Sequence, residues 1–230
     1  MMVSKELLSQ NQLFATLNGR IKNALVEKAI LAEYPARLDL FQQGGAPSPL
    51  YILLSGRVKL YRQSKDKCQI LALPITGDCL GAESLPTGAP GPYSATTLTP
   101  IKAIVLMPDD LQELLDDHPD FQEIFLKLIT DRLKQFVTLV HDLAFRDVTS
   151  RLAMVLLTRA ETEGLPHHEG IIFDRLLSQQ EYADLVGTAR EVIYRTFKRF
   201  EDSGVIRADR LTIIIRDHDA LHAIAFHESH

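Results

Sequence analysis

Residues 178–200 read SQQEYADLVGTAREVIYRTFKRF. Ser178 can cap a first helix, because Glu181 lies three residues later, as a capping box requires. Gly187 is suited to end that helix in a tight turn, since glycine adopts a left-handed backbone without strain. Thr188 can then cap a second helix. Two short helices joined by a glycine turn predict a helix-turn-helix.

The second helix is predicted to present side chains that recognise bases. Residues 191 and 195 lie one turn apart, so Arg190, Glu191 and Arg195 project to one side. In the major groove an arginine can donate to guanine O6 and N7, and a glutamate can accept from cytosine N4. The alternative interpretation is a solvated surface helix with an ion pair between Glu191 and Arg195.

A small β-hairpin is predicted after the second helix. Ser203 and Gly204 end the helix, and residues 205–206 and 211–215 have the composition of two strands, which together predict a wing. Side chains around the two helices and the wing turn are predicted to contact the DNA backbone. These predicted backbone contacts are Ser178, Gln180, Thr188, Lys198, Arg199, Arg207 and Arg210.

The composition is that of an ordinary globular protein with two compact units. The chain has 230 residues, of which 46% are hydrophobic and 24% charged, and its net charge of -5 requires any DNA contact to be local. No apolar run approaches the length of a membrane span, and the N-terminus lacks a secretory signal, so a cytoplasmic protein without a membrane partner is expected. Cys68 and Cys79 lack metal-ligand spacing, which predicts buried thiols and no metal site.

The N-terminal half predicts a compact β structure. Residues 11–32 carry apolar residues at helical spacing, which indicates one or two short amphipathic helices. Short strand-like runs separated by glycine and proline then predict an antiparallel barrel or roll, followed by a short helix from Pro108 to Leu115. The predicted strands are residues 50–54, 57–62, 69–75, 94–98 and 102–107.

A long helix is predicted from Pro119 onward. Its apolar residues recur at nearly heptad spacing, which favours packing against the same helix of a second copy, while Ile129, Val137 and Val140 widen the apolar face toward the roll. The alternative is an ordinary core helix of a monomer. A hinge with a helix cap is predicted at Asp147. The predicted dimer seam comprises Phe121, Phe125, Leu128, Phe136, Leu139 and Leu143.

Nearly the whole chain resembles the Crp/Fnr family of bacterial transcription regulators. The matching segments are Tyr34-Pro35 leading to Gln43-Gly44, residues 50–56, Gly77-Asp78, residues 143–147, and the winged helix of residues 178–215. The resemblance implies an α+β fold with a β-roll sensor domain (residues 1–118), a dimerisation helix and hinge (119–146) and a winged helix-turn-helix domain (147–230).

The same resemblance implies a function. It implies a homodimer that binds double-stranded DNA, works with RNA polymerase, and changes the spacing of its two recognition helices when an effector binds the roll. Arg190, Glu191 and Arg195 look like the subgroup that reads palindromic TGTGA-type sites, although Tyr194 replaces a residue that is usually small.

The effector positions depart from those of cAMP-binding members. The matching positions read Gly81-Ala82, Tyr93-Ser94 and Phe136-Val137, with Glu83 and Ser84 next to the first pair. The arginine that would neutralise a cyclic phosphate is absent from them, and burial of that anion without a cation costs several kcal/mol, which argues against cAMP. A different small molecule, haem or no ligand remain the alternatives. His118, His141 and His167-His168 lack clear ligand spacing for haem.

Enzymes, and sensor modules that do not bind DNA, fit the sequence less well. A metal-dependent enzyme built on a similar small barrel needs histidines on its strands, and no histidine precedes His118. No GxSxG elbow of a hydrolase occurs. A sensor module that does not bind DNA would lack the winged helix. The sequence therefore predicts a regulator and not an enzyme.

Overall fold

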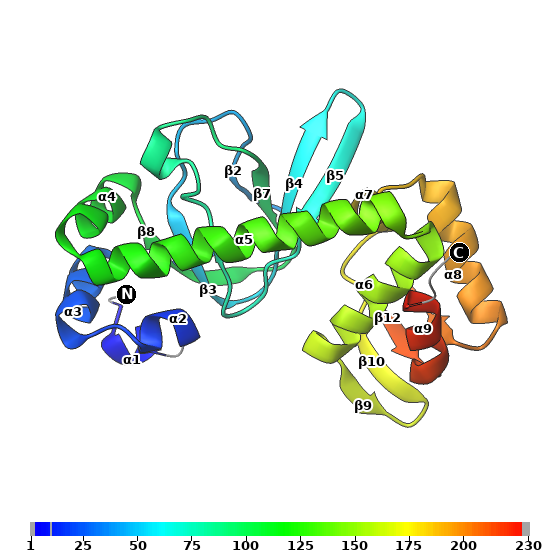
Figure 1. The fold of residues 1–230 in the computed structure, drawn as a ribbon. Coiled ribbons are helices and arrows are strands. Elements are labelled where there is room, and N and C mark those ends of the chain that lie inside the picture. The colour runs from blue at the N-terminus through cyan, green and yellow to red at the C-terminus, as the bar shows by residue number, and fades with distance from the viewer. Residues whose placement is uncertain (1–2, 10, 227–230) are drawn as a thin grey trace. The chain divides into compact units, whose positions relative to one another are not determined.

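The computed structural model describes residues 3–9 and 11–226. The chain divides into two compact units, Met1–Phe136 and Val137–His230, and each is described by itself (Figure 1). Helix α5 (Pro119–Phe145) begins in the first unit and ends in the second.

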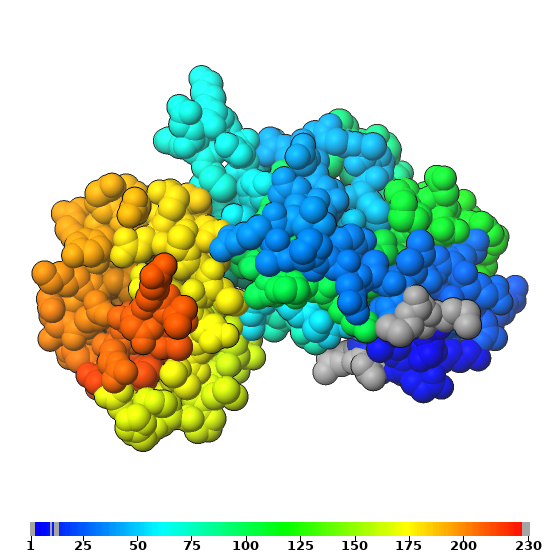
Figure 2. Space-filling model, turned by 180° about the vertical axis from the view of Figure 1, so that it is seen from behind, coloured from blue at the N-terminus to red at the C-terminus, as the bar shows by residue number. Residues whose placement is uncertain are grey.

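The N-terminal unit contains two antiparallel four-stranded sheets, as predicted for a roll. In the first sheet the strand order is β1 (Ile30–Tyr34), β8 (Ile101–Leu106), β3 (Leu50–Ser55) and β6 (Cys79–Leu80). In the second the order is β2 (Asp39–Phe41), β7 (Ser94–Thr97), β4 (Val58–Ser64) and β5 (Lys67–Ala72). The β4–β5 hairpin projects from the body of this unit in the space-filling view (Figure 2).

Short helices accompany the sheets of the N-terminal unit. They are α1 (Lys5–Ser9), α2 (Gln12–Ala15), α3 (Gly19–Lys28), the 3-10 helix η1 (Leu85–Thr87) and α4 (Pro108–Asp117). The prediction that helical structure extends to Ala32 was wrong. Residues 30–32 belong to β1 and pair with β8, because this sheet needs an edge strand that the local apolar spacing does not reveal.

Part of the predicted dimer seam lies inside the N-terminal unit. Phe121 is fully buried and Phe125 is 5% exposed, both in a core cluster shared with α3 and α4. Leu128 and Phe136 also pack against the cores of this unit, and Leu139 and Leu143 are half-buried. The assignment of Phe121 and Phe125 to a seam is therefore corrected, because they occupy the face of α5 that packs on its own chain.

The C-terminal unit combines a helical layer with a small antiparallel sheet. Its helices are α6 (Val148–Glu163), α7 (Gln179–Val186), α8 (Arg190–Asp202) and α9 (His218–Ala225). Its strands are ordered β11 (Ile206–Ala208), β12 (Thr212–Ile215), β10 (Gly170–Asp174) and β9 (Leu165–His167). The predicted wing is confirmed as the β11–β12 pair. Among the described helices, none is long and apolar enough to cross a membrane.

Candidate DNA-binding face and effector site

The first helix of the predicted helix-turn-helix is built as expected. The Ser178 Oγ accepts from the Glu181 amide at 3.2 Å, and the Glu181 carboxylate accepts from the Ser178 amide at 2.9 Å, which completes the capping box. Gly187 ends α7 with a φ of 71°, a left-handed conformation that favours glycine. These local contacts set where the turn begins and ends.

Thr188 does not cap the second helix, so this prediction was wrong. The residue preceding α8 is Ala189, which makes no side-chain capping bond. The amide of Thr188 instead donates to the Ala183 carbonyl at 3.0 Å. Because the Gly187 turn takes up one residue more than the pattern suggested, α8 starts at Arg190.

A shared apolar core holds α8 against α7. Val186 and Ile193 are at most 1% exposed. The ring of Phe197 meets that of Tyr182 edge-on, with centroids 5.2 Å apart, and the Arg175 guanidinium lies 5.2 Å from the Phe197 ring centroid. With one face of α8 buried in this way, its other face is left for solvent or a ligand.

The predicted base-reading residues all lie on the exposed face of α8. Arg190, Glu191 and Arg195 are exposed, as is Lys198 further along the helix. In the described part of the chain, Glu191 and Arg195 form no ion pair with each other. The guanidinium of Arg199 donates to the Thr149 hydroxyl, so this side chain is tied to α6 in the structure.

The remaining predicted backbone contacts lie around the two helices and the wing. Ser178 and Gln180 are exposed, and the Nε2 of the Gln180 side chain donates to the Asp184 carboxylate at 2.8 Å. Thr188 is half-buried, and Arg210 is exposed at the wing turn. The structure therefore places these polar groups at the surface of the unit that carries α8.

Asp209 builds the wing turn. Its carboxylate accepts from the amides of Leu211 at 2.8 Å and Thr212 at 2.7 Å, and from the Thr212 hydroxyl at 3.0 Å. These amide hydrogen bonds hold the pKa of Asp209 below its usual range. Asp209 thus has a structural role in the wing turn.

Glu169 forms ion pairs with two arginines, and the sequence did not identify it as a functional or structural residue. Its carboxylate accepts from Arg216 and Arg207, and the hydrogen bond from Arg216 lowers the pKa of Glu169. Potential ligand atoms of His167, His168 and Glu169 lie within 4.8 Å of one another. Because the carboxylate already carries two arginine partners, a cation at this cluster would have to compete with both.

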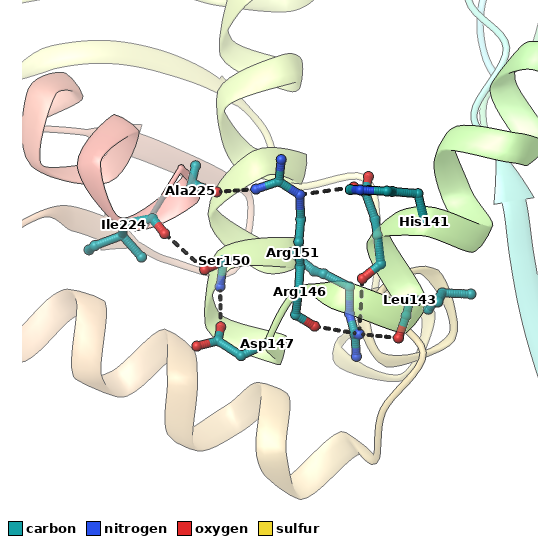
Figure 3. A network of polar contacts seen from close by, with 9 residues as sticks. His141, Leu143, Arg146, Asp147, Ser150, Arg151, Ile224 and Ala225 are labelled. Carbon is teal, nitrogen blue, oxygen red and sulfur yellow. Dashed lines mark hydrogen bonds and ion pairs between the residues drawn. The ribbon is translucent and has the colours of Figure 1, made fainter. Parts of the chain in front are cut away.

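Arginine side chains close the junction of α5 and α6 within the C-terminal unit (Figure 3). One terminal nitrogen of Arg151 donates to the carbonyls of Leu143 at 3.0 Å and Arg146 at 2.9 Å. It thereby satisfies carbonyls that the end of α5 leaves without intrahelical partners. Asp147 caps α6 as predicted, accepting from the Ser150 amide at 2.7 Å.

Helix α9 is tied to the same junction (Figure 3). Arg146 donates through Nε to Asp142 at 2.9 Å and through a terminal nitrogen to the Ala225 carbonyl at 2.8 Å. The Ser150 hydroxyl donates to the Ile224 carbonyl at 2.9 Å. The end of α5, the start of α6 and the end of α9 therefore form one hydrogen-bonded assembly.

The predicted effector positions surround a sharply turned loop. Gly81 has a φ of 84°, and a Cβ there would lie 2.2 Å from the Pro49 carbonyl oxygen, so only glycine fits. Ala82 is fully buried with a φ of 67°. Ser84 is 6% exposed, and Ser94 is 7% exposed with its hydroxyl accepting from the Gln43 amide at 2.9 Å.

Glu83, Tyr93 and Arg132 form a buried polar cluster beside this loop. The Tyr93 hydroxyl donates to the Glu83 carboxylate, and the Arg132 Nε lies 3.7 Å from a Glu83 oxygen. Burial raises the pKa of Glu83 and raises that of Tyr93 well above its usual range. Phe136 meets the Tyr93 ring edge-on with centroids 6.0 Å apart, whereas Val137 is 61% exposed.

The sequence reasoning missed Arg132 as the cation of this region. Its side chain is 11% exposed, and its terminal nitrogens donate to the Cys79 carbonyl at 2.7 Å and to Gln135 at 2.6 Å. Its Nε is buried without a hydrogen-bond partner. Arg132 lies four residues after Leu128 and four residues before Phe136, and residues at this spacing share one face of a helix. The spacing could therefore have indicated that Arg132 faces the core of its unit.

Comparison with known proteins covers both units. A model of the cyclic nucleotide-binding domain matches residues 31–118, and a model of the Crp-like helix-turn-helix domain matches residues 150–224. A CRP-like cAMP-activated global transcriptional regulator of Mycobacterium tuberculosis is 29% identical over 217 residues, covering 94% of this chain and 97% of the relative. A global nitrogen regulator of Synechocystis is 27% identical, covering 93% and 96%.

A solved structure of a regulator is similar to most of the chain. The c-di-GMP responsive global regulator CLP of Xanthomonas campestris superimposes with a TM-score of 0.74 at 25% identity, covering 86% of this chain and 99% of that one. These relatives are transcription regulators and not enzymes. With a β-roll unit followed by a winged helix-turn-helix, and with both domain models matched in that order, the chain belongs to the Crp/Fnr family of transcription regulators.

Proposed function

We propose that this protein is a cytoplasmic homodimer that binds a palindromic, TGTGA-like site in double-stranded DNA and acts on RNA polymerase there. The observation that carries the proposal is the exposed face of α8, where Arg190, Glu191 and Arg195 project from a helix whose opposite face is buried. These side chains match the hydrogen-bonding edges of guanine and cytosine in the major groove. Two such helices about one DNA turn apart would read two half-sites.

The dimer would form through the exposed apolar face of α5. Leu126, Leu133, Val137 and Val140 are 66%, 60%, 61% and 65% exposed. Leu126, Leu133 and Val140 repeat every seven residues, and Val137 lies four residues after Leu133, which is the spacing of a coiled-coil seam. A second copy would cover this stripe with its own, because equal helices meet symmetrically in a two-fold dimer.

Substitution within the stripe tests the dimer. Leu133→Gln is expected to shift the protein toward monomer in sedimentation equilibrium, while the far-UV spectrum stays unchanged because the side chain is exposed. The control is Leu165→Gln in β9, where the side chain is 67% exposed outside the stripe. Equal effects of both changes, or a wild-type monomer, would contradict the proposed interface.

The effector proposed for the roll is a small molecule other than cAMP, or none. The support is that Arg132, the cation of this region, already lies beside the Glu83 carboxylate and donates to two other groups. A cyclic phosphate would have to displace those partners. Calorimetric titration with cAMP is expected to give no heat of binding, and micromolar affinity would refute this part. Haem is the second candidate, and a Soret band after haem addition would support it.

Base reading is tested by Arg195→Ala. The truncation is expected to cost about 1–3 kcal/mol of binding to a selected palindrome and to relax base preference at one position of each half-site. Selection from random duplexes with each protein, followed by titration, measures both effects. Arg20→Ala, an exposed arginine on α3, is the control. An equal loss on every DNA sequence would show that Arg195 contacts only the backbone.

A further inference from the structure

Tyr194 is an aromatic side chain exposed on the recognition helix. It is 54% exposed and is the one large hydrophobic residue exposed on α8, all of whose residues are described. The core face of α8 is occupied by Ile193, Phe197 and Phe200, each at most 3% exposed. Tyr194 therefore adds little to the packing of its own domain, and its ring is free to contact a ligand.

The neighbours of Tyr194 place it among the groups that face DNA in the proposed function. Arg190 lies four residues before it and Lys198 four residues after it, so the three side chains follow one another along the helix. Arg195 is the next residue in the chain. The distance along the axis from Arg190 to Tyr194 is about 6 Å at 1.5 Å per residue, which corresponds to no more than about two base pairs of duplex.

The major groove offers one apolar group to such a ring. Guanine, cytosine and adenine present hydrogen-bonding atoms at their major-groove edges, whereas thymine adds a C5-methyl group. The charged neighbours of Tyr194 can satisfy the hydrogen-bonding edges. A half-exposed aromatic ring gains most by covering the methyl group, because apolar surface of both partners then leaves water.

We propose that Tyr194 contacts the C5-methyl group of a thymine in each half-site and thereby adds a base preference to those of Arg190, Glu191 and Arg195. This inference rests on the proposed function. The recognised feature is the methyl group itself, so uracil in place of thymine removes it while keeping every hydrogen-bonding atom of the base. Because the ring and not the hydroxyl makes the contact, Tyr194→Phe keeps the preference and Tyr194→Ala loses it.

The test uses a palindromic duplex selected from random sequence by the wild-type chain. Each thymine is replaced by uracil, one symmetric pair at a time, and the dissociation constants of wild type, Tyr194→Phe and Tyr194→Ala are measured by fluorescence anisotropy. Loss of one methyl contact is expected to weaken binding about fourfold per half-site and about 15-fold for the pair, from the burial of one methyl-sized group. This loss should occur at one symmetric pair, for wild type and Tyr194→Phe only.

The other outcomes are decisive. The proposal fails if no uracil position weakens wild type, or if Tyr194→Ala loses as much as wild type at the sensitive position. A uniform loss with Tyr194→Phe, together with unchanged uracil sensitivity in Tyr194→Ala, would show a hydroxyl contact to phosphate and overturn it. Thermal melting checks that both variants fold. If wild type selects no sequence at all, the proposed function itself is refuted, and the inference with it.

Discussion

Replacement of Arg159 by methionine should strongly destabilise the C-terminal unit. Arg159 is 5% exposed and joins α6 to the helix-turn-helix. Its guanidinium donates twice to Glu163, at 2.9 and 3.0 Å, once to the Tyr182 hydroxyl at 2.8 Å and once to the Asp174 carbonyl at 2.6 Å. It also lies 4.9 Å from the Phe173 ring centroid. Methionine keeps most of the apolar stem but removes every donor.

The expected loss in the free energy of unfolding follows from the effect on Glu163. The Glu163 side chain is only 10% exposed, so without Arg159 a carboxylate with little access to water loses both of its hydrogen bonds from the guanidinium. Removal of one partner of such a pair costs about 3–5 kcal/mol. Urea unfolding followed by far-UV circular dichroism measures the loss of free energy of unfolding. The chain has no tryptophan, so backbone ellipticity is the direct signal.

Two further variants separate the charge from the packing. Glu163→Gln keeps a hydrogen-bond acceptor for Arg159 and should cost less than Arg159→Met. The double variant should recover part of the loss, since the carboxylate that lost its guanidinium partner is gone and residues in contact couple nonadditively. A cost below about 1 kcal/mol for Arg159→Met would refute the reasoning, because it would mean that the Glu163 carboxylate does not depend on the guanidinium for its stabilisation.

Three other predictions concern the loop, the turn and the wing. Burial raises the pKa of Glu83. The contribution of this carboxyl group to stability is therefore fully present below the ordinary pKa of 4.5 and is lost as pH rises through the folded-state pKa. Glu83→Gln should flatten that part of the pH profile of the melting temperature. Gly187→Ala should cost about 1–2 kcal/mol in urea unfolding because its φ of 71° is left-handed, and no measurable cost would contradict a strained turn. Arg210→Ala should weaken all duplexes similarly and reduce the salt dependence of binding, whereas a change of preferred sequence would point to base contact.

The helix-turn-helix and the order of the domains could be predicted from the amino-acid sequence alone. The capping box of Ser178 and Glu181 and the turn at Gly187 are interactions within three or four residues, so their signal is complete in a short segment. Strands β3, β4, β5, β7 and β8 of the roll were predictable for the same reason, because short apolar runs and glycine turns alternate locally, whereas β1, β2 and β6 were not predicted. Thr188 shows the limit of that reasoning: the N-cap position lies one residue later, at Ala189, and α8 starts at Arg190.

The residues that meet across the chain could not be predicted in this way, because their contacts depend on the tertiary fold. Helix α5 has two apolar faces, and residue spacing alone does not show which of them is buried. Packing against α3 and α4 puts Phe121 and Phe125 in the core and leaves Leu133 exposed. Arg132 and Glu83 meet because a helix from one part of the chain crosses a loop from another. Pairings of this kind depend on the path of the backbone between the two residues, and no local pattern of residue types records that path.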